Sequence, residues 1–401
     1  PWQTVPASDA ATAQRVSALI DLDQRSRAEL GAERWYDAAV AWAAFLYVAA
    51  VVVGWARRRP GPPRAVGAVL ASVPVASFLA QIVPWWRVGS WLQGLLTVGV
   101  AAAVGSVAAL SPWTRQWPWR TAGFVGAVTA AVLAADASTG SHLSLDAPFG
   151  DNPIVAGRFH GLGNVAFALL GAGTLVLAAA VATSLPRPRA GAAVFGLGTA
   201  AVVVDGLPAL GDDFGGMVAL LPAVAVLGLA VLHVRISWRP LAAVLVATVM
   251  ATAGITLYDY TRPPSQRTHL GRFVGQILDG SAWTVVHRKL DNSLGSFSGG
   301  WARWIVLGWV VLALAAYIGH RQGRLRLATA VDRRIAGGLL AALTVLAALG
   351  AGFNDSGLGV AAFVFFVAAP VLVPMLEPVP LTPVSSAPES VEAAPPGVRR
   401  S

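Results

Sequence analysis

The sequence contains no cysteine and only one lysine, Lys289, in 401 residues. Without cysteine the chain can form no disulfide framework, no cysteine-ligated iron–sulfur cluster and no thiolate zinc site. Charged residues are also scarce, at 12% of the chain, whereas soluble domains carry about 25%. A Walker phosphate loop and an HExxH metal motif are both absent, which excludes the enzyme classes that depend on them.

Apolar residues make up 56% of the chain, and the mean hydropathy is +0.63. A single soluble core stops growing at about 250–300 residues, so this much apolar sequence cannot all be buried in a globule. A lipid bilayer is the remaining solvent for it, and helices satisfy their own backbone hydrogen bonds there. The sequence therefore predicts an all-α fold, a polytopic bundle of transmembrane helices.

Runs of about 17–25 apolar residues mark the expected membrane spans. The runs 121–136 and 191–205 each end in an aspartate and are the weakest of the set. The eleven predicted spans are residues 37–55, 65–83, 91–110, 121–136, 164–184, 191–205, 217–233, 240–258, 304–319, 335–352 and 358–376.

The loops between these spans alternate in charge. Seventeen arginines but only four acids occupy the loops 57–64, 115–120, 187–189, 235–239 and 321–334 together with the tail. Basic residues collect in cytoplasmic loops, so we predict an outside N-terminus and an inside C-terminus, as an odd number of spans requires. The net charge of +9 arises from basic residues in the short loops between spans, so we expect no nucleic-acid partner.

Three regions follow from this reading. Residues 1–35 form an extracytoplasmic linker segment, residues 36–376 form the membrane domain with a long outer loop at 259–303, and residues 377–401 form a disordered cytoplasmic tail rich in Pro, Ser, Ala and Glu. The chain begins at Pro1 with no methionine and no signal-peptide pattern, so we expect a piece of a longer or processed protein.

The first polar cluster on the predicted outer side is the segment 146–164, which leads into the fifth span. It supplies Arg158, His160 and Asn164 as candidate ligand-binding or catalytic groups, among glycines that allow sharp turns. The alternative interpretation is a capping loop whose polar residues satisfy helix ends.

The second cluster is the acidic pair Asp212 and Asp213, directly before the seventh span. Such a pair can act as a catalytic base with an orienting partner or hold a divalent cation, the one cofactor left open here. Alternatively, Asp213 caps the helix and Asp212 lies near the positive end of its dipole. We predict that Arg158, His160, Asp212 and Asp213 converge on one outer site, because each would be unfavourable unpaired near the membrane.

The third cluster is the outer loop 259–303, which carries Arg262, Arg267, His269 and Arg272. Apolar residues recur at helical spacing over 270–278, which predicts an amphipathic helix at the membrane interface. Planar guanidinium groups suit phosphate, so this segment is a candidate for capturing a phosphate or pyrophosphate headgroup. General attraction to anionic lipid is the plainer alternative.

The segments NPIVAGRFHGLGN (152–164), LGDDFGG (210–216) and TRPPSQRTHLGRF (261–273) resemble the C-terminal membrane region of a family of bacterial, largely actinobacterial, envelope proteins. Those proteins carry an alkaline-phosphatase/sulfatase-like ectodomain before the membrane region. The resemblance implies such an ectodomain as a partner and supplies no catalytic residues. The phosphatase-like domain itself is missing from this chain.

These observations support one main functional hypothesis and two alternatives. The main hypothesis is a multi-pass protein of the bacterial plasma membrane that binds or translocates an anionic lipid or a polyprenyl-phosphate-linked intermediate at the outer leaflet. One alternative is a membrane transferase for lipid-linked glycosyl or phosphoryl groups with an outer active site. The other is a membrane anchor for a separate ectodomain. Charged residues are nearly absent from the middle of the spans, which counts against proton-coupled transport.

Overall fold

Eleven helices in the described part of the chain are long and apolar enough to cross a membrane. Each corresponds to one predicted span, including the two that end in an aspartate, and the all-α polytopic fold is thereby confirmed. The structure is a computed structural model, which describes residues 9–156, 160–207, 209–234, 238–267, 269–284, 287, 291, 295, 300–354 and 356–380.

The elements follow one another along the chain as helices joined mostly by short loops. Their bounds are α1 Asp9–Ala56, α2 Arg64–Leu79, η1 Ala80–Ile82, η2 Trp85–Arg87, α3 Ser90–Leu110, α4 Pro118–Ser138, α5 Pro153–Ala156, α6 Asn164–Ala182, α7 Arg187–Gly206, α8 Phe214–Val231, α9 Trp238–Thr261, η3 Pro264–Gln266, α10 His269–Leu278, α12 Ala302–Arg321, β1 Leu325–Leu327, α13 Arg333–Phe353, α14 Leu358–Leu372, η4 Val373–Met375 and β2 Leu376–Pro378.

Helix α6 is the most buried span and packs on α4, α7, α13 and α14. Its approach to α4 is close because glycines face each other across the interface. A β-carbon added at Gly126 would lie only 2.6 Å from the carbonyl oxygen of Gly173. Lipid tails are as apolar as the helices, so close packing at small residues drives this association.

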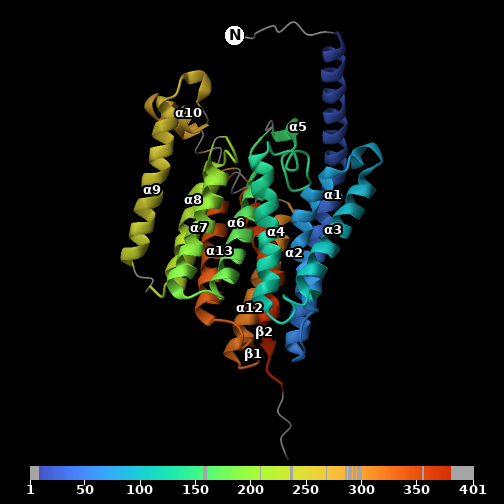
Figure 1. Cartoon of the computed structure of the whole chain (residues 1–401), viewed down its shortest axis with the longest axis vertical. Helices are drawn as coiled ribbons and strands as arrows, with labels where there is room; N and C mark the ends of the chain where they lie inside the picture. The colour runs from blue at the N-terminus through green and yellow to red at the C-terminus, as the bar shows by residue number, and fades with distance from the viewer. Residues whose placement is uncertain are drawn as a thin grey trace, which may run out of the picture.

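The two ends of the bundle differ in what they carry (Figure 1). One end holds α5, α10 and the projecting N-terminal part of α1, and we name it the outer end after the predicted orientation. The opposite, inner end holds the short hairpin in which Leu325 pairs with Pro378 and Leu327 with Leu376. The loops 57–63, 111–117 and 322–332 lie at this inner end, so the arginine-rich loops gather on one side, as the positive-inside pattern requires.

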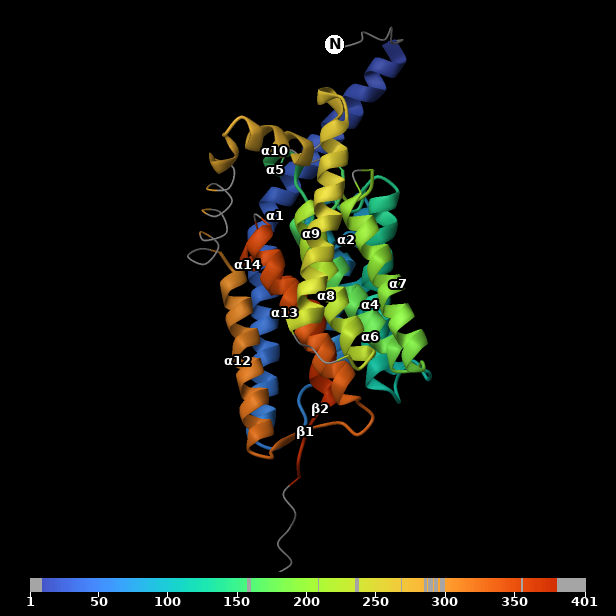
Figure 2. The ribbon, with the colours of Figure 1, turned by 90° about the vertical axis from the view of Figure 1, so that its left-hand side faces the viewer.

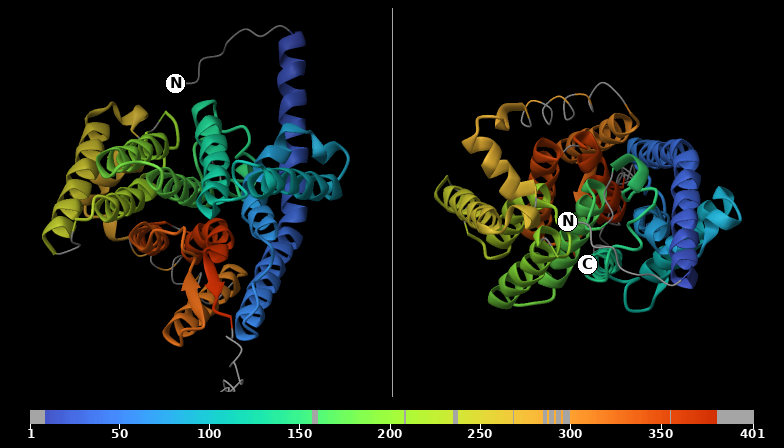
Figure 3. Two further views of the ribbon diagram at one scale, coloured as in Figure 1. Left: turned by 60° about the horizontal axis from the view of Figure 1, so that its bottom comes forward. Right: turned by 90° about the horizontal axis from the view of Figure 1, so that it is seen from above.

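Helices α9 and α10 form an arm at the edge of the bundle. Helix α9 is the least buried of the spans, and the view from above places it at the edge of the bundle, away from α1 (Figure 3). Helix α10 lies across the outer end of α9 (Figure 2). The helix over 269–278 confirms the helix expected there, and its Ile277 and Leu278 are exposed.

Two boundaries differ in detail from the predicted regions. Helix α1 runs unbroken through residues 35 and 36, so the outer segment and the first span form one helix of 48 residues. The predicted tail starts inside strand β2, because Glu377 and Pro378 pair with β1 and Glu377 lies 3.6 Å from Arg326. This part of the tail prediction is wrong, since strand pairing satisfies the backbone there; residues 381–401 lie outside the described residues.

Candidate functional site

The loop after α4 is folded back onto its helix by one carboxylate. Asp136 accepts hydrogen bonds from the backbone nitrogens of Leu143 (2.7 Å) and Ser144 (2.8 Å), and from the Ser144 hydroxyl (2.7 Å). A buried carboxylate is unfavourable at a helix C-terminus unless donors surround it. The aspartate that weakened the prediction of this span therefore organises the loop that follows it.

The predicted approach of His160 to the acidic pair is present in the structure. The Nε2 atom of His160 lies 3.8 Å from the Oδ2 atom of Asp212, and the imidazole is 61% exposed. The two loops are held together beside this pair, since the Leu162 nitrogen donates to the Gly211 carbonyl oxygen at 2.7 Å. Two segments about 50 residues apart in the sequence thus place a histidine and a carboxylate side by side at the outer end. We call the surface around His160 and Asp212 the rim.

Asp213 performs the capping role that was one of its predicted alternatives. Its side chain accepts a hydrogen bond from the Gly216 nitrogen at 3.1 Å, at the start of α8. The carboxylate of Asp205, at the end of α7, lies against the same glycine: a β-carbon at Gly216 would sit 2.4 Å from Asp205 Oδ2 and 2.9 Å from Asp213 Oδ2. Asp205 is fully buried and was not among the predicted site residues.

Asn164 fastens this region to the turn between α13 and α14. Its Nδ2 atom donates to the Ser356 hydroxyl at 2.8 Å, in the turn between α13 and α14. Asn354 in the same turn lies beside the first turn of α8, because a β-carbon at Gly215 would be 2.5 Å from its Oδ1. The polar outer site therefore includes a turn that follows it by some 190 residues.

Three site residues have backbone angles that side chains rarely adopt. Ser141, Asp146 and Asp212 have φ values of 59°, 56° and 50°. Such conformations cost energy and collect at functional sites. Ser141 lines a small depression of about 160 Å³ of empty space, which includes open solvent. The residues that line it are Ser141, Ser144, Leu145, Asp151, His160 and Gly161.

The outer part of α1 docks onto the same loops. Arg25 lies 3.7 Å from the buried carboxylate of Asp146, and it also donates to the carbonyl oxygens of His142 and Leu145. Asn152 donates to Glu29 at 2.9 Å. Burial raises the pKa of Asp146, a shift that the nearby Ser26 hydroxyl and the charge of Arg25 oppose. Only the composition of α1, with charges at helical spacing, hinted at these contacts.

The third predicted cluster forms the arm rather than the rim. Asp259, near the end of α9, accepts hydrogen bonds from Gly271 N at 2.8 Å and from Arg262 at 3.1 Å, which locks α10 to α9. Arg267 lies over the ring of Tyr260, 4.3 Å from its centroid, and donates to the Arg262 carbonyl oxygen at 3.0 Å. Arg272 lies in α10 with an exposed side chain.

Some of the predicted ligands cannot be placed. Arg158 and the side chain of His269 lie outside the described residues. Within the part of the chain that the structure describes, no three side chains of His, Asp or Glu come close enough together to hold a metal ion. Asp213 instead caps α8, and Asp136 and Asp259 tie the following segments to their helices.

Searches of protein-family models, curated proteins and solved structures find no match to this chain, so its function is argued from its own geometry.

Proposed function

We propose that this integral membrane protein binds a phosphate-bearing lipid at the outer leaflet of a bacterial plasma membrane, with an anionic lipid or a polyprenyl-phosphate-linked intermediate as its ligand. Binding of this kind would be the first step of translocating such an intermediate. The observation that carries the proposal is the arm of α9 and α10.

The arm combines lipid-facing and phosphate-binding groups in one place. Ile277, Leu278 and Trp283 are 56%, 70% and 68% exposed, so within the described residues most of their apolar surface is uncovered. A helix with such a face lies in the interface between headgroups and acyl chains. Arg267 and Arg272 on the same arm then stand at headgroup level, where charge-assisted bonds to phosphate form.

The rim formed by His160 and Asp212 supports a second candidate function, that of a transferase acting on lipid-linked phosphoryl or glycosyl groups. His160 is exposed and its Nε2 atom lies 3.8 Å from the Asp212 carboxylate, so a closer approach on ligand binding would make it a general base with an orienting partner. The two hydroxyl groups of Ser141 and Ser144 line the depression beside it. A catalytic role for Asp213 would have to operate together with its capping bond.

Lipid binding by the arm can be tested with a charge-removing double variant. Arg267→Gln with Arg272→Gln should lower the retention of polyprenyl phosphate about tenfold or more in native mass spectrometry of the purified chain, because each bond to a charged group contributes about 1.5–3 kcal/mol. Arg27→Gln is the matched control, since Arg27 is an exposed outer arginine paired with Asp23. Equal retention in all three proteins would refute lipid binding and leave the anchor as the better explanation.

We also propose that an alkaline-phosphatase-like ectodomain contacts the projecting part of α1. Val16, Leu19 and Ile20 are exposed there by 49%, 65% and 53%, beyond the loops of the outer end. A photocrosslinker at position 19 should capture that domain when both are produced together, whereas one at Val310 on the lipid-facing side of α12 should not.

A further inference from the structure

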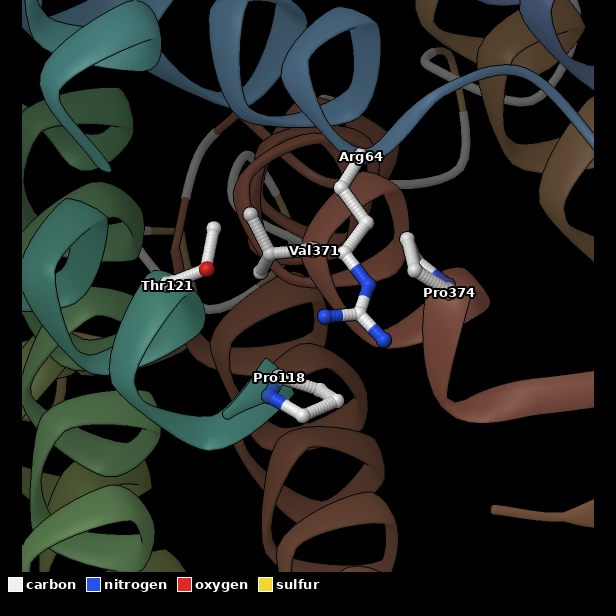
Figure 4. Close-up of a pocket in the computed structure, with 5 residues that line it drawn as sticks. All are labelled: Arg64, Pro118, Thr121, Val371 and Pro374. Atoms are coloured by element: carbon white, nitrogen blue, oxygen red, sulfur yellow. The ribbon is translucent and has the colours of Figure 1, made fainter. Parts of the chain in front are cut away.

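Three helix ends meet at the inner end of the bundle. A depression between the starts of α2 and α4 and the end of α14 is too shallow there to hold even a water molecule (Figure 4). Elsewhere on the same end, α8 packs against both α7 and α13 (Figure 1). A β-carbon at Gly191 of α7 would lie 2.5 Å from Leu232 Cδ2, and one at Gly338 of α13 would lie 2.4 Å from the Ala230 β-carbon. The starts of α7 and α13 therefore both lie against the end of α8.

Exposed arginines occupy the first turns of α7 and α13. They are Arg187 and Arg189 in α7, and Arg333 and Arg334 in α13. The N-terminus of a helix carries a partial positive charge, so cations are unfavourable there. None of the four side chains makes an ion pair or a hydrogen bond within the described residues. Helix stability therefore does not explain these arginines, whereas an anion bound across them would offset their repulsion.

His233, directly after α8, lies at the meeting point of the three ends. Its backbone has a φ of 59°, which side chains rarely adopt. Partial burial lowers the pKa of its imidazole, and the charges of Arg187 and Arg334 lower it further, so arginines of two helices act on one ring. Asp332 opposes this shift. Its carboxylate is used to cap α13, because it accepts bonds from the backbone nitrogens of Arg334 at 2.8 Å and Ile335 at 3.1 Å.

Apolar side chains beside these cations favour a lipid over a soluble anion. Leu185, just before α7, is 37% exposed, and Leu232 and Val234 on either side of His233 in the sequence are 37% and 43% exposed. Cations next to exposed apolar groups suit the boundary between headgroups and acyl chains. Basic sites between the cytoplasmic ends of membrane helices bind anionic headgroups in this way.

We propose that the joined ends of α7, α8 and α13 bind the phosphate group of an anionic phospholipid of the inner leaflet. The guanidinium groups of Arg187 and Arg334 donate to the phosphate oxygens, for which their planar forks are suited. His233 donates a further hydrogen bond, and the acyl chains lie on Leu232 and Val234. The site is independent of the outer arm, because it lies at the opposite end of the bundle.

The test uses the purified chain carrying Arg267→Gln and Arg272→Gln, so that the arm adds no bound lipid. Native mass spectrometry compares retention of phosphatidylglycerol in this background with that after adding Arg187→Gln, Arg334→Gln or the control Arg324→Gln. The control removes an exposed inner-end arginine that follows α12. We expect Arg187→Gln and Arg334→Gln each to lower retention about fivefold, the effect of one basic residue at an anionic headgroup, and the control to leave it unchanged. Equal effects of all three would show general attraction by the inner surface and overturn the proposal.

Two further measurements separate binding from folding and lipid from free phosphate. Both substitutions remove a cation from a helix start, so the melting temperature should stay the same or rise. Retention of phosphatidylglycerol unchanged by Arg187→Gln and Arg334→Gln in proteins that melt normally would refute the site. Excess inorganic phosphate should leave the lipid bound; displacement of phosphatidylglycerol by phosphate would assign the site to the free anion and overturn the lipid assignment.

Discussion

The imidazole of His160 and the carboxylate of Asp212 lie 3.8 Å apart on the outer rim, although α6 and α7 separate them in the sequence. The contact is possible because the Gly211 carbonyl oxygen accepts a bond from Leu162 and fixes the two loops side by side. At this contact the backbone of Asp212 has a φ of 50°, a conformation that is unfavourable for most residues other than glycine.

The backbone of Asp212 should decide which substitutions the rim tolerates. Asparagine adopts positive φ more readily than branched residues do, so Asp212→Asn should melt close to the wild type, whereas Asp212→Val should lose about 1–2 kcal/mol. Thermal unfolding of the detergent-solubilised protein measures both. If the pair contributes to ligand binding, both variants also retain less polyprenyl phosphate; normal retention by Asp212→Asn would make the pair purely structural.

Removal of the Asp136 carboxylate should loosen the loop that carries the rim. Asp136→Ala leaves three donors without their acceptor, which should cost about 3 kcal/mol or more. Asp23→Ala is the control, because it breaks only an exposed pair with Arg27, worth about 0–1 kcal/mol. A melting temperature equally lowered by the two variants would contradict this role of Asp136.

The buried carboxyl of Asp146 should make stability depend on pH. Burial raises its pKa in the folded protein, so the folded state binds the proton more tightly than the unfolded state does. Its contribution is therefore most favourable below the ordinary carboxyl pKa and is lost as the pH rises through the raised value. The melting temperature of Asp146→Asn relative to the wild type should increase over that interval; a constant or falling difference would disprove the shift.

Glycine should be required where the carboxylates of Asp205 and Asp213 meet. A methyl group at Gly216 would lie 2.4 Å from one and 2.9 Å from the other, so Gly216→Ala should destabilise the protein clearly. Gly94→Ala in α3 meets open space and should be neutral or stabilising by up to about 1 kcal/mol. Comparison of the two melting temperatures tests whether the pocket at Gly216 is as tight as the geometry indicates.

The predicted orientation can be read directly from thiol labelling, since the chain has no cysteine of its own. Ser265→Cys, in the exposed turn before α10, should react with a membrane-impermeant reagent applied from outside. Arg59→Cys, in the exposed loop before α2, should react only after the membrane is opened. Labelling of position 59 from outside would reverse the topology.

The sequence by itself determined the membrane architecture. Runs of apolar residues identify spans because the bilayer imposes one length and one solvent on every helix, whatever its neighbours. The amphipathic helix at 269–278 and the cap at Asp213 were likewise readable, since periodicity and capping depend on residues within one or two turns.

Only the tertiary structure decided which polar groups meet. The contact of His160 with Asp212 was expected because unpaired charges near the membrane are unfavourable. The roles of Asp136, Asp205 and Ser356 were not expected, because they depend on which helices and turns are neighbours, and the sequence does not specify this. The outer part of α1 looked like a linker until Arg25 was found against Asp146. The sequence placed the arm and the rim on the same outer side, and only the structure put α9 and α10 at the edge of the bundle. Spans of similar hydropathy can pack in many orders, and the close approach of small residues selects among them.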